Sequence, residues 1–297
     1  MTSVASGRKL RPMLAMLCAV AMFAIMDTGL KVLAGTLPSV QVATLRAASS
    51  LPLIVLYAVL AGRLSALKAV HWPLHLLRAT LGVLMLGSFA YALRGMSLAN
   101  AYSLFFVAPL IITAMAAWFL KEQVDRKRWY AILFGFIGVI VILRPTGDGM
   151  LSLGGLMVLI SATAYAVSAI TVRVIARHDS IESMMFWLCL LMTIIGGAIA
   201  APNWVALETK HVLPLVVIGI TGTVAQFAVT YAFHQGEASM IAPFEYTALI
   251  WGVLIDWVLW SVLPDGITLL GAGFLIASGI YLIRHERQHE EDPAAHP

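Results

Sequence analysis

Two carboxylates stand in one of the most apolar stretches of the chain, IAPFEYTALIWGVLIDWVLW, at positions Glu245 and Asp256. An acid at the centre of a membrane helix costs roughly 2.5–3.5 kcal/mol on insertion scales, so intramembrane acids normally face a polar cavity or a charged partner. The two acids are eleven positions apart, about three helical turns, so a helix places both on one face with Leu249 and Gly252 between them. We expect this face to look into the protein, where a carboxylate can bind a cationic or hydrogen-bond-donating group or carry a proton.

Glu245 is the strongest candidate for chemistry because it lies nearer the middle of the stretch. We predict that Glu245 and the adjacent Tyr246 bind the substrate. Glu245 is also the candidate proton carrier, since an ionisable group inside a membrane is by default a functional candidate. The alternative is a permanent ion pair that ties helices together, with one of the cations inside the expected spans. Those cations are Lys31, Arg46 and Arg173.

A second set of charges is expected to stabilise the bundle. Asp256 lies closer to the outer interface, and we predict a structural ion pair for it, as for Arg46 and Arg173. Asp27 and Lys31 are four residues apart with the acid first, which is the favourable order for an ion pair on a helix. Both are also candidates for binding the substrate, and the sequence leaves the structural and the binding role of Lys31 open.

Polar and aromatic side chains complete the expected substrate site. Gln226 and Thr230 share one face of a helix, Tyr102 and Phe105 are three residues apart on another, and Tyr165 supplies a further ring. Cavities for small molecules are mostly apolar with a few fixed polar groups, so we predict that these residues line the cavity and bind the substrate. The alternatives are that Gln and Thr bond between helices for stability alone and that the aromatic rings only fill space.

The elements that position these residues must be membrane helices. The chain has 297 residues, of which 61% are hydrophobic and 11% charged, and its mean hydropathy is +0.91. Soluble domains are typically about 45–50% apolar and about 25% charged. A span needs roughly 20 apolar residues. We expect an all-α integral membrane protein with ten spans, at residues 13–34, 39–62, 73–93, 97–120, 128–144, 153–177, 181–201, 212–233, 238–260 and 266–284.

The distribution of basic residues predicts the orientation. With a cytoplasmic N-terminus, thirteen of the 19 Lys and Arg residues lie on the inner side, and only Arg94, Arg144 and Lys210 lie outside. Both termini are then cytoplasmic, in a bacterial inner membrane. The basic residues cluster in short inner loops and do not indicate a nucleic-acid partner. We expect residues 285–297, which are polar and lack an apolar period, to form a disordered cytoplasmic tail.

The chain consists of two similar halves. YALRGMSLANAYSLFFVAPL, from Tyr91, aligns with YAFHQGEASMIAPFEYTALI, from Tyr231, and Phe23-Ala24 aligns with Tyr165-Ala166. We therefore predict repeats at residues 1–147 and 148–284. Because each repeat has five spans, an odd number, the second enters the membrane from the opposite side, and inverted repeats of this kind support alternating access around a site near the midplane.

The chain resembles the drug/metabolite transporter superfamily, in its EamA branch, over nearly its whole length. The matching features are Lys31, Arg46, Pro109, Glu122, RWYAILFGFIGVIVILRP from Arg128, Pro243, Tyr246, Pro264 and LLGAGFLIASGIYL from Leu269. The resemblance implies ten helices and a central cavity lined mainly by spans 1, 3, 4, 6, 8 and 9, in a scaffold that serves amino acids, nucleotide-like metabolites, cofactors and drugs. The chain departs from the family pattern at WSVLP, which lacks the counterpart of Glu122, and at Asp256, where a small residue is common.

We therefore expect a secondary transporter of a small organic metabolite: an amino acid, a nucleoside-like or cofactor-like compound, or a cationic amphipathic compound. Its partners are the substrate, the lipid bilayer and protons as the candidate coupling ion. No cofactor or resident metal is expected: the motifs H-E-x-x-H, G-x-S-x-G and the P-loop are absent, and we interpret His71 and His75 as interface residues. A passive channel is the alternative, and an intramembrane enzyme is less favoured.

Overall fold

The computed structural model describes residues 2–68, 71–121 and 153–291, and between the last two segments residues 129–130, 133–134, 137–138 and 140–141. Within these residues the regular secondary structure is helical. In chain order the elements, with 3-10 turns marked η, are α1 (Thr2–Ala34), α2 (Ser39–Leu60), η1 (Leu64–Leu67), α3 (Trp72–Ala92), α4 (Leu98–Phe105), α5 (Val107–Phe119), α7 (Leu153–Ile175), α8 (Ile181–Ala200), η2 (Ala201–Asn203), η3 (Thr209–His211), α9 (Val212–Gln235), α10 (Ala238–Ile241), η4 (Ala242–Thr247), α11 (Ala248–Trp260) and α12 (Gly266–Glu291).

Seven helices in the described part of the chain are long and apolar enough to cross a membrane, which confirms the predicted all-helical membrane fold. They are Leu10–Ala34, Ser39–Leu60, Trp72–Ala92, Leu98–Phe119, Leu153–Ile175, Ile181–Asn203 and Thr209–Gln235. Gly266–Ser278 is a shorter apolar helix. The expected fifth span, 128–144, lies mostly outside the described residues, as does the expected repeat boundary after residue 147.

Apolar side chains cover much of the outer surface of the bundle, while several charges lie inside it. Leu60 and Trp118 keep 78% and 76% of their surface exposed, whereas Arg46 and Arg78 are 2% exposed and Asp256 is 0% exposed. Large exposed apolar surfaces rimmed by polar residues are typical of membrane contact. Buried charges, in contrast, need polar partners inside the protein.

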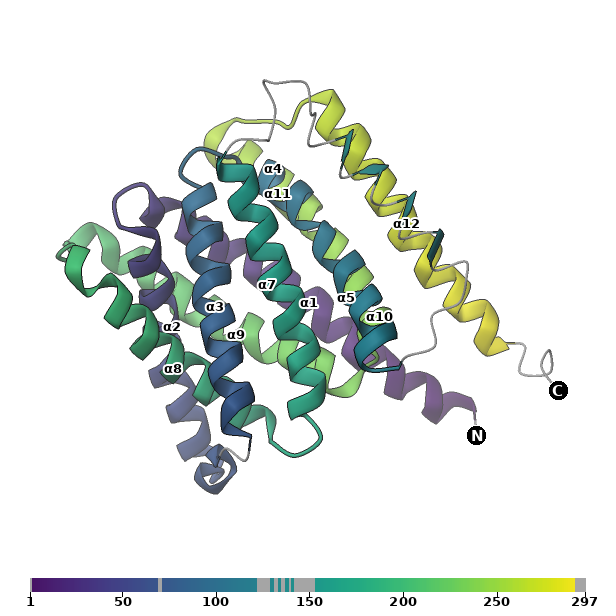
Figure 1. The fold of residues 1–297 in the computed structure, drawn as a ribbon, viewed down its shortest axis with the longest axis horizontal. Helices are drawn as coiled ribbons and strands as arrows, with labels where there is room; N and C mark the ends of the chain where they lie inside the picture. Colours follow the sequence, from purple (N-terminus) through teal and green to yellow (C-terminus); the bar gives the residue numbers. More distant parts are fainter. Residues whose placement is uncertain are drawn as a thin grey trace.

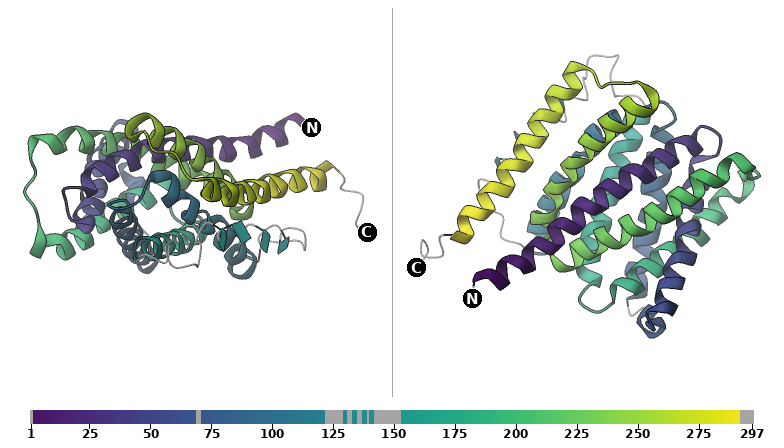
Figure 2. Two further views of the ribbon diagram at one scale, coloured as in Figure 1. Left: turned by 90° about the horizontal axis from the view of Figure 1, so that it is seen from above. Right: turned by 180° about the vertical axis from the view of Figure 1, so that it is seen from behind.

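The helices associate in pairs that join the two halves of the chain (Figure 1). α1 runs along α9, α3 along α7, and α2 along α8, and α4 lies against α11. The counterpart of α1 in the second half is α7, and the counterpart of α3 is α9. Exchanging counterparts turns the α1–α9 pair into the α3–α7 pair and leaves the α2–α8 and α4–α11 pairs as they are. A pair of repeats related by a two-fold axis produces this pattern. The start of α1 and the end of α12 lie at the same end of the bundle (Figure 2).

The fourth span of each half, expected at 97–120 and 238–260, is interrupted. α4 ends at Phe105 because Pro109 has no N–H to donate to the Phe105 carbonyl and its ring crowds that carbonyl. In the second half, α10 gives way to η4, whose second residue is Pro243, before α11 begins. A 3-10 segment in the middle of a helical stretch often marks a functional hinge.

The two interruptions contact each other. Phe106 is the turn residue between α4 and α5, and Tyr246, which lies 140 positions later, is part of η4. Their rings meet edge to face with centroids 5.2 Å apart. Irregular backbone at membrane depth is tolerated where it is buried in protein or lines a cavity. The interruptions therefore indicate where a substrate cavity should lie.

The last helix extends into the segment that the sequence predicts to be disordered. α12 remains helical to Glu291, so residues 285–291 continue the last helix. Their sequence, HERQHEE, contains mostly Glu, Arg and Gln, which are good helix formers, and an existing helix is extended more easily than a new one is nucleated. Residues 292–297 lie outside the described part of the chain.

Gly252 allows the close approach of α11 to α4, since a Cβ at this position would lie 2.6 Å from Cδ2 of Tyr102 and 3.3 Å from Cα of Ala99. We predict that Gly252→Ala lowers the free energy of unfolding by about 1–3 kcal/mol, because a hydrogen bond to Asp27 holds Tyr102 in place. The unfolding midpoint in detergent measures the effect. Gly95→Ala, where a Cβ meets no described atom within 4 Å, is the control and should leave the midpoint unchanged or slightly higher. Equal midpoints for both variants would contradict the α4–α11 contact.

Candidate functional site

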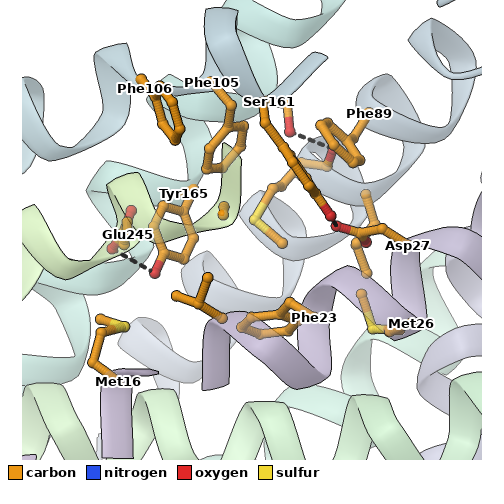
Figure 3. A pocket seen from close by; sticks show the side chains of 15 residues that line it. Met16, Phe23, Met26, Asp27, Phe89, Phe105, Phe106, Ser161, Tyr165 and Glu245 are labelled. Carbon is orange, nitrogen blue, oxygen red and sulfur yellow. Dashed lines mark hydrogen bonds between the residues drawn. The ribbon is translucent and has the colours of Figure 1, made fainter. Parts of the chain in front are cut away.

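A cavity of about 100 Å³ lies between helices of both halves. α1, α3 and α4 contribute from the first half, and α7, η4 and α11 contribute from the second. The walls are largely aromatic and aliphatic, with the carboxyl groups of an aspartate and a glutamate among them (Figure 3). Five of the predicted substrate-binding residues line this cavity: Asp27, Tyr102, Phe105, Tyr165 and Glu245.

Glu245 presents a carboxyl group with unused hydrogen-bonding capacity. The hydroxyl of Tyr165 donates to its Oε1 at 2.9 Å (Figure 3). Oε2 is buried and accepts no hydrogen bond from any residue that the structure describes. Lys31 and Arg46, which were alternative ion-pair partners, contact other groups. Glu245 is thus available to a ligand or a proton.

Asp27 is held by a neighbour from another helix and not by the cation on its own helix. The hydroxyl of Tyr102 donates to Oδ2 of Asp27 at 2.8 Å. Tyr102 in turn lies parallel to the ring of Phe89, with an interplanar angle of 13° and centroids 6.1 Å apart. The expected ion pair between Asp27 and Lys31 is therefore wrong. The reason is that Lys31 has a better-placed carboxylate on α11, which sequence spacing does not reveal.

Asp256 joins three helices at one point. Its Oδ1 accepts from Nζ of Lys31 at 3.0 Å, and its Oδ2 accepts from the backbone N–H of Ala99 at 2.7 Å. Ala99 is the second residue of α4, and its N–H is one of the donors that a helix start leaves without an intrahelical partner. Nζ of Lys31 also lies 4.0 Å from the centroid of the Trp260 ring. Asp256 and Lys31 therefore connect α1, α4 and α11.

A second, smaller cavity of about 40 Å³ adjoins the first. In its wall, Arg46 donates to Oε1 of Gln226 at 3.1 Å, and Nε2 of Gln226 donates to Oγ1 of Thr230 at 3.2 Å. Arg78 donates to the same Thr230 oxygen at 3.4 Å and to the Met184 carbonyl at 3.0 Å. Arg46 forms no ion pair with any described residue, so the predicted ion pair is wrong. Its guanidinium group donates instead to the neutral side-chain amide of Gln226 on α9.

Sequence reasoning missed several residues of these cavities, among them Arg78 and Phe23. Arg78 is one of the thirteen basic residues that were expected on the inner side, although its position six residues into α3 signals burial inside the span. Phe23 lines both cavities, and its alignment with Tyr165 in the other half was the available signal, since Tyr165 lines both as well.

Other expected residues lie away from the first cavity. Tyr246 is buried against Phe106 and does not line it. His75, interpreted as an interface residue, lies in the first turn of α3, where it is buried and contacts Oδ2 of Asp179 at 2.7 Å in the segment between α7 and α8. Arg173 lies in the last turn of α7, and its ion pair stays a prediction.

Comparisons with known proteins place these features in context. Residues 10–144 and 152–284 each match the EamA-like transporter family. A riboflavin transporter of Vibrio cholerae is 30% identical over 84% of this chain and 84% of that protein. A pseudopaline exporter of Pseudomonas aeruginosa is 27% identical over 89% of this chain and 93% of that protein. An S-adenosylmethionine uptake transporter of Rickettsia conorii is 27% identical over 80% of this chain and 79% of that protein.

A solved crystal structure has the same fold. It superposes with a TM-score of 0.73 and covers 96% of this chain and 99% of that chain at 18% sequence identity.

The Lys31–Asp256 contact predicts strong coupling between the two side chains. Lys31→Met should lower the free energy of unfolding by about 3–5 kcal/mol because it leaves a buried carboxylate without its cation. Lys31→Met combined with Asp256→Asn should recover most of this loss, since the amide oxygen can still accept from Ala99. Denaturant unfolding of the single and double variants measures the coupling.

The exposed pair of Lys210 and Glu208, 2.9 Å apart, supplies the control. Lys210→Met should cost less than about 1 kcal/mol, as is usual for exposed pairs. The buried contact would be contradicted if the double variant lost as much free energy of unfolding as the Lys31→Met and Asp256→Asn variants lose together.

Proposed function

Because the chain belongs to the EamA-like transporter family, we propose that it is a secondary transporter that moves a small organic metabolite across the inner membrane by alternating access. It is a multi-pass membrane protein with two EamA repeats, and its relatives are transporters, not enzymes. The observation that carries the proposal is the carboxyl group of Glu245, which keeps one buried oxygen without a hydrogen bond at a cavity walled by both halves.

The proposed architecture has ten transmembrane helices in two inverted repeats, residues 1–147 and 148–284. The exchange symmetry of the α1–α9 and α3–α7 pairs supports it, as do the interruptions in the fourth span of each half. Discontinuous helices at the interface between repeats are typical of substrate sites in transporters. We place both termini in the cytoplasm, in agreement with the shared end of α1 and α12 and with the excess of basic residues in inner loops (Figure 2).

The proposed substrate combines a planar or apolar part with a cationic or hydrogen-bond-donating group. Tyr102, Phe105 and Tyr165 offer the aromatic walls, while Asp27 and Glu245 offer the acceptors. Relatives named for riboflavin and S-adenosylmethionine support this class, since both molecules contain a planar ring system. In this proposal Gln226 contacts the substrate from the second cavity, and Lys31 and Tyr246 support the site from outside the walls.

Substrate entry requires the walls to separate. The first cavity, at about 100 Å³, is smaller than the roughly 300–1,000 Å³ of typical small-molecule sites. The interruptions at Phe106 and in η4 allow segments of one span to move independently. Alternating movement of this kind would open the cavity to one side of the membrane at a time.

Proton coupling is proposed to act through Glu245. A carboxylate surrounded by apolar and aromatic groups, with no contacting cation among the described residues, needs a compensating positive charge. Either a proton or a cationic group of the substrate can supply this charge. Competition between the two for the Glu245 carboxyl group would couple the transport of the substrate to the movement of protons.

Ligand stabilisation provides the first test. Purified protein should gain thermal stability from a compound of the proposed class, with a shift that saturates as the compound occupies the cavity. The screen covers amino acids, nucleosides, cofactors such as riboflavin, and cationic aromatic compounds. Tyr165→Phe should weaken a hit by about three- to tenfold through loss of the hydroxyl that orients Glu245. A compound that binds to Tyr165→Phe and to Glu245→Gln as tightly as it binds to wild type would contradict the assigned cavity.

Transport in proteoliposomes provides the second test. A carrier exchanges labelled substrate against unlabelled substrate on the other side, whereas a passive channel does not show saturable counterflow. Glu245→Gln should retain counterflow but lose accumulation driven by a proton gradient, because the amide cannot exchange a proton. Glu208→Gln, in the loop between α8 and α9, is the matched control and should behave as wild type. Proton-driven accumulation by Glu245→Gln would exclude the coupling role.

A further inference from the structure

Two arginines are buried side by side in the polar wall of the second cavity. Arg46 on α2 and Arg78 on α3 are each 2% exposed, and both line the cavity of about 40 Å³. Both side chains therefore border the same small space. Like charges that are buried together repel, so this arrangement requires compensation from another group.

The described residues supply hydrogen bonds but no contacting anion. Arg46 donates to the Gln226 side chain and the Gly222 carbonyl, Arg78 donates to Thr230 and the Met184 carbonyl, and all four acceptors are neutral. The Nε donor of each arginine is buried and has no hydrogen-bond partner in the described structure. Asp27 and the Cys189 thiol lie within electrostatic range of Arg46, but no carboxylate of the described chain forms an ion pair with either guanidinium.

The size and donors of this cavity define what would complete it. A cavity needs roughly 10–15 Å³ of probe-occupied volume to hold one water molecule, so a cavity of about 40 Å³ has room for a small polar group. Arginine forms paired hydrogen bonds to planar oxyanions, and these bonds are among the strongest that a side chain makes. A carboxylate group fits both the volume and the charge.

We infer that Arg46 and Arg78 form an anion subsite that binds the carboxylate of the transported substrate. Phe23, Met85, Leu86 and Tyr165 line this cavity and the larger one, so the two cavities are neighbours, and a substrate that displaces these side chains would extend into both. The substrate class is thereby narrowed, on the basis of the proposed function, to compounds with an aromatic or apolar part, a donor or cation for Glu245, and a carboxylate for the arginines.

Formate tests the subsite without knowledge of the substrate. The unfolding midpoint of the purified full-length protein is measured while sodium formate replaces sodium gluconate at constant ionic strength, because gluconate is too large for the cavity. Wild type should show a saturable, formate-dependent rise. Arg46→Gln and Arg78→Gln should each weaken formate binding at least tenfold, the effect expected for loss of about 1.4 kcal/mol or more from a charged hydrogen bond.

Arg94→Gln is the matched control. Arg94 donates to the carbonyls of Ala34 and Leu37 outside both cavities, so this variant should respond to formate as wild type does. Thr230→Val tests the subsite if an arginine variant does not fold, and it should weaken formate binding several-fold because its hydroxyl positions Arg78 and Gln226. Absence of a formate response in wild type, or an unchanged response in the arginine and Thr230 variants, overturns the inference.

The hits of the ligand screen test the substrate class separately. A carboxylate-bearing hit should bind at least tenfold more weakly to Arg78→Gln, while its amide should bind wild type and variant alike. A carboxylate-bearing hit that binds Arg78→Gln as tightly as wild type overturns the carboxylate assignment. Formate binding requires no transport, so failure of counterflow with an intact formate response would reject the proposed function and keep the anion subsite.

Discussion

A charge inside a membrane bundle persists only where a polar group, a ligand or a proton meets it, and this constraint organises the interior of the protein. Asp256 satisfies it completely, because Lys31 and the N–H of Ala99 occupy both of its oxygens. Asp27 and Glu245 satisfy it partly, through the hydroxyls of Tyr102 and Tyr165. The number of hydrogen bonds that each carboxyl group already accepts therefore distinguishes Asp256, a structural charge, from Asp27 and Glu245, which remain available to a substrate.

In the second half, the interrupted span places one of these charges, Glu245 in η4, at the wall of the larger cavity. Where α4 gives way to α5 and α10 to η4, the backbone departs from a regular α-helix inside the bundle. Asp256 accepts from the start of α4, next to Lys31. The same region holds Glu245 at the cavity wall and places Tyr246 against Phe106. In the proposed function, structural support and substrate contact come from neighbouring residues of one segment.

The two cavities differ in charge and share part of their walls. Carboxyl groups line the larger cavity and guanidinium groups the smaller one, with Phe23 and Tyr165 common to both. These two residues align in the two halves of the sequence. The repeats thus provide an apolar frame of similar side chains, and residues without charged counterparts in the other half, such as Glu245 opposite Phe105, give the frame its polarity.

The membrane fold, the two repeats and the burial of the Glu245–Asp256 face follow from the sequence, because hydropathy, span length and helical spacing are local properties. Partner choice depended on the tertiary structure. Asp27 and Lys31 have ideal spacing for an ion pair, yet each contacts a residue from another helix, and Arg46 meets an amide where an acid was expected. Helix register and crossing bring together residues that are distant in sequence, and short-range spacing carries no information on those distances.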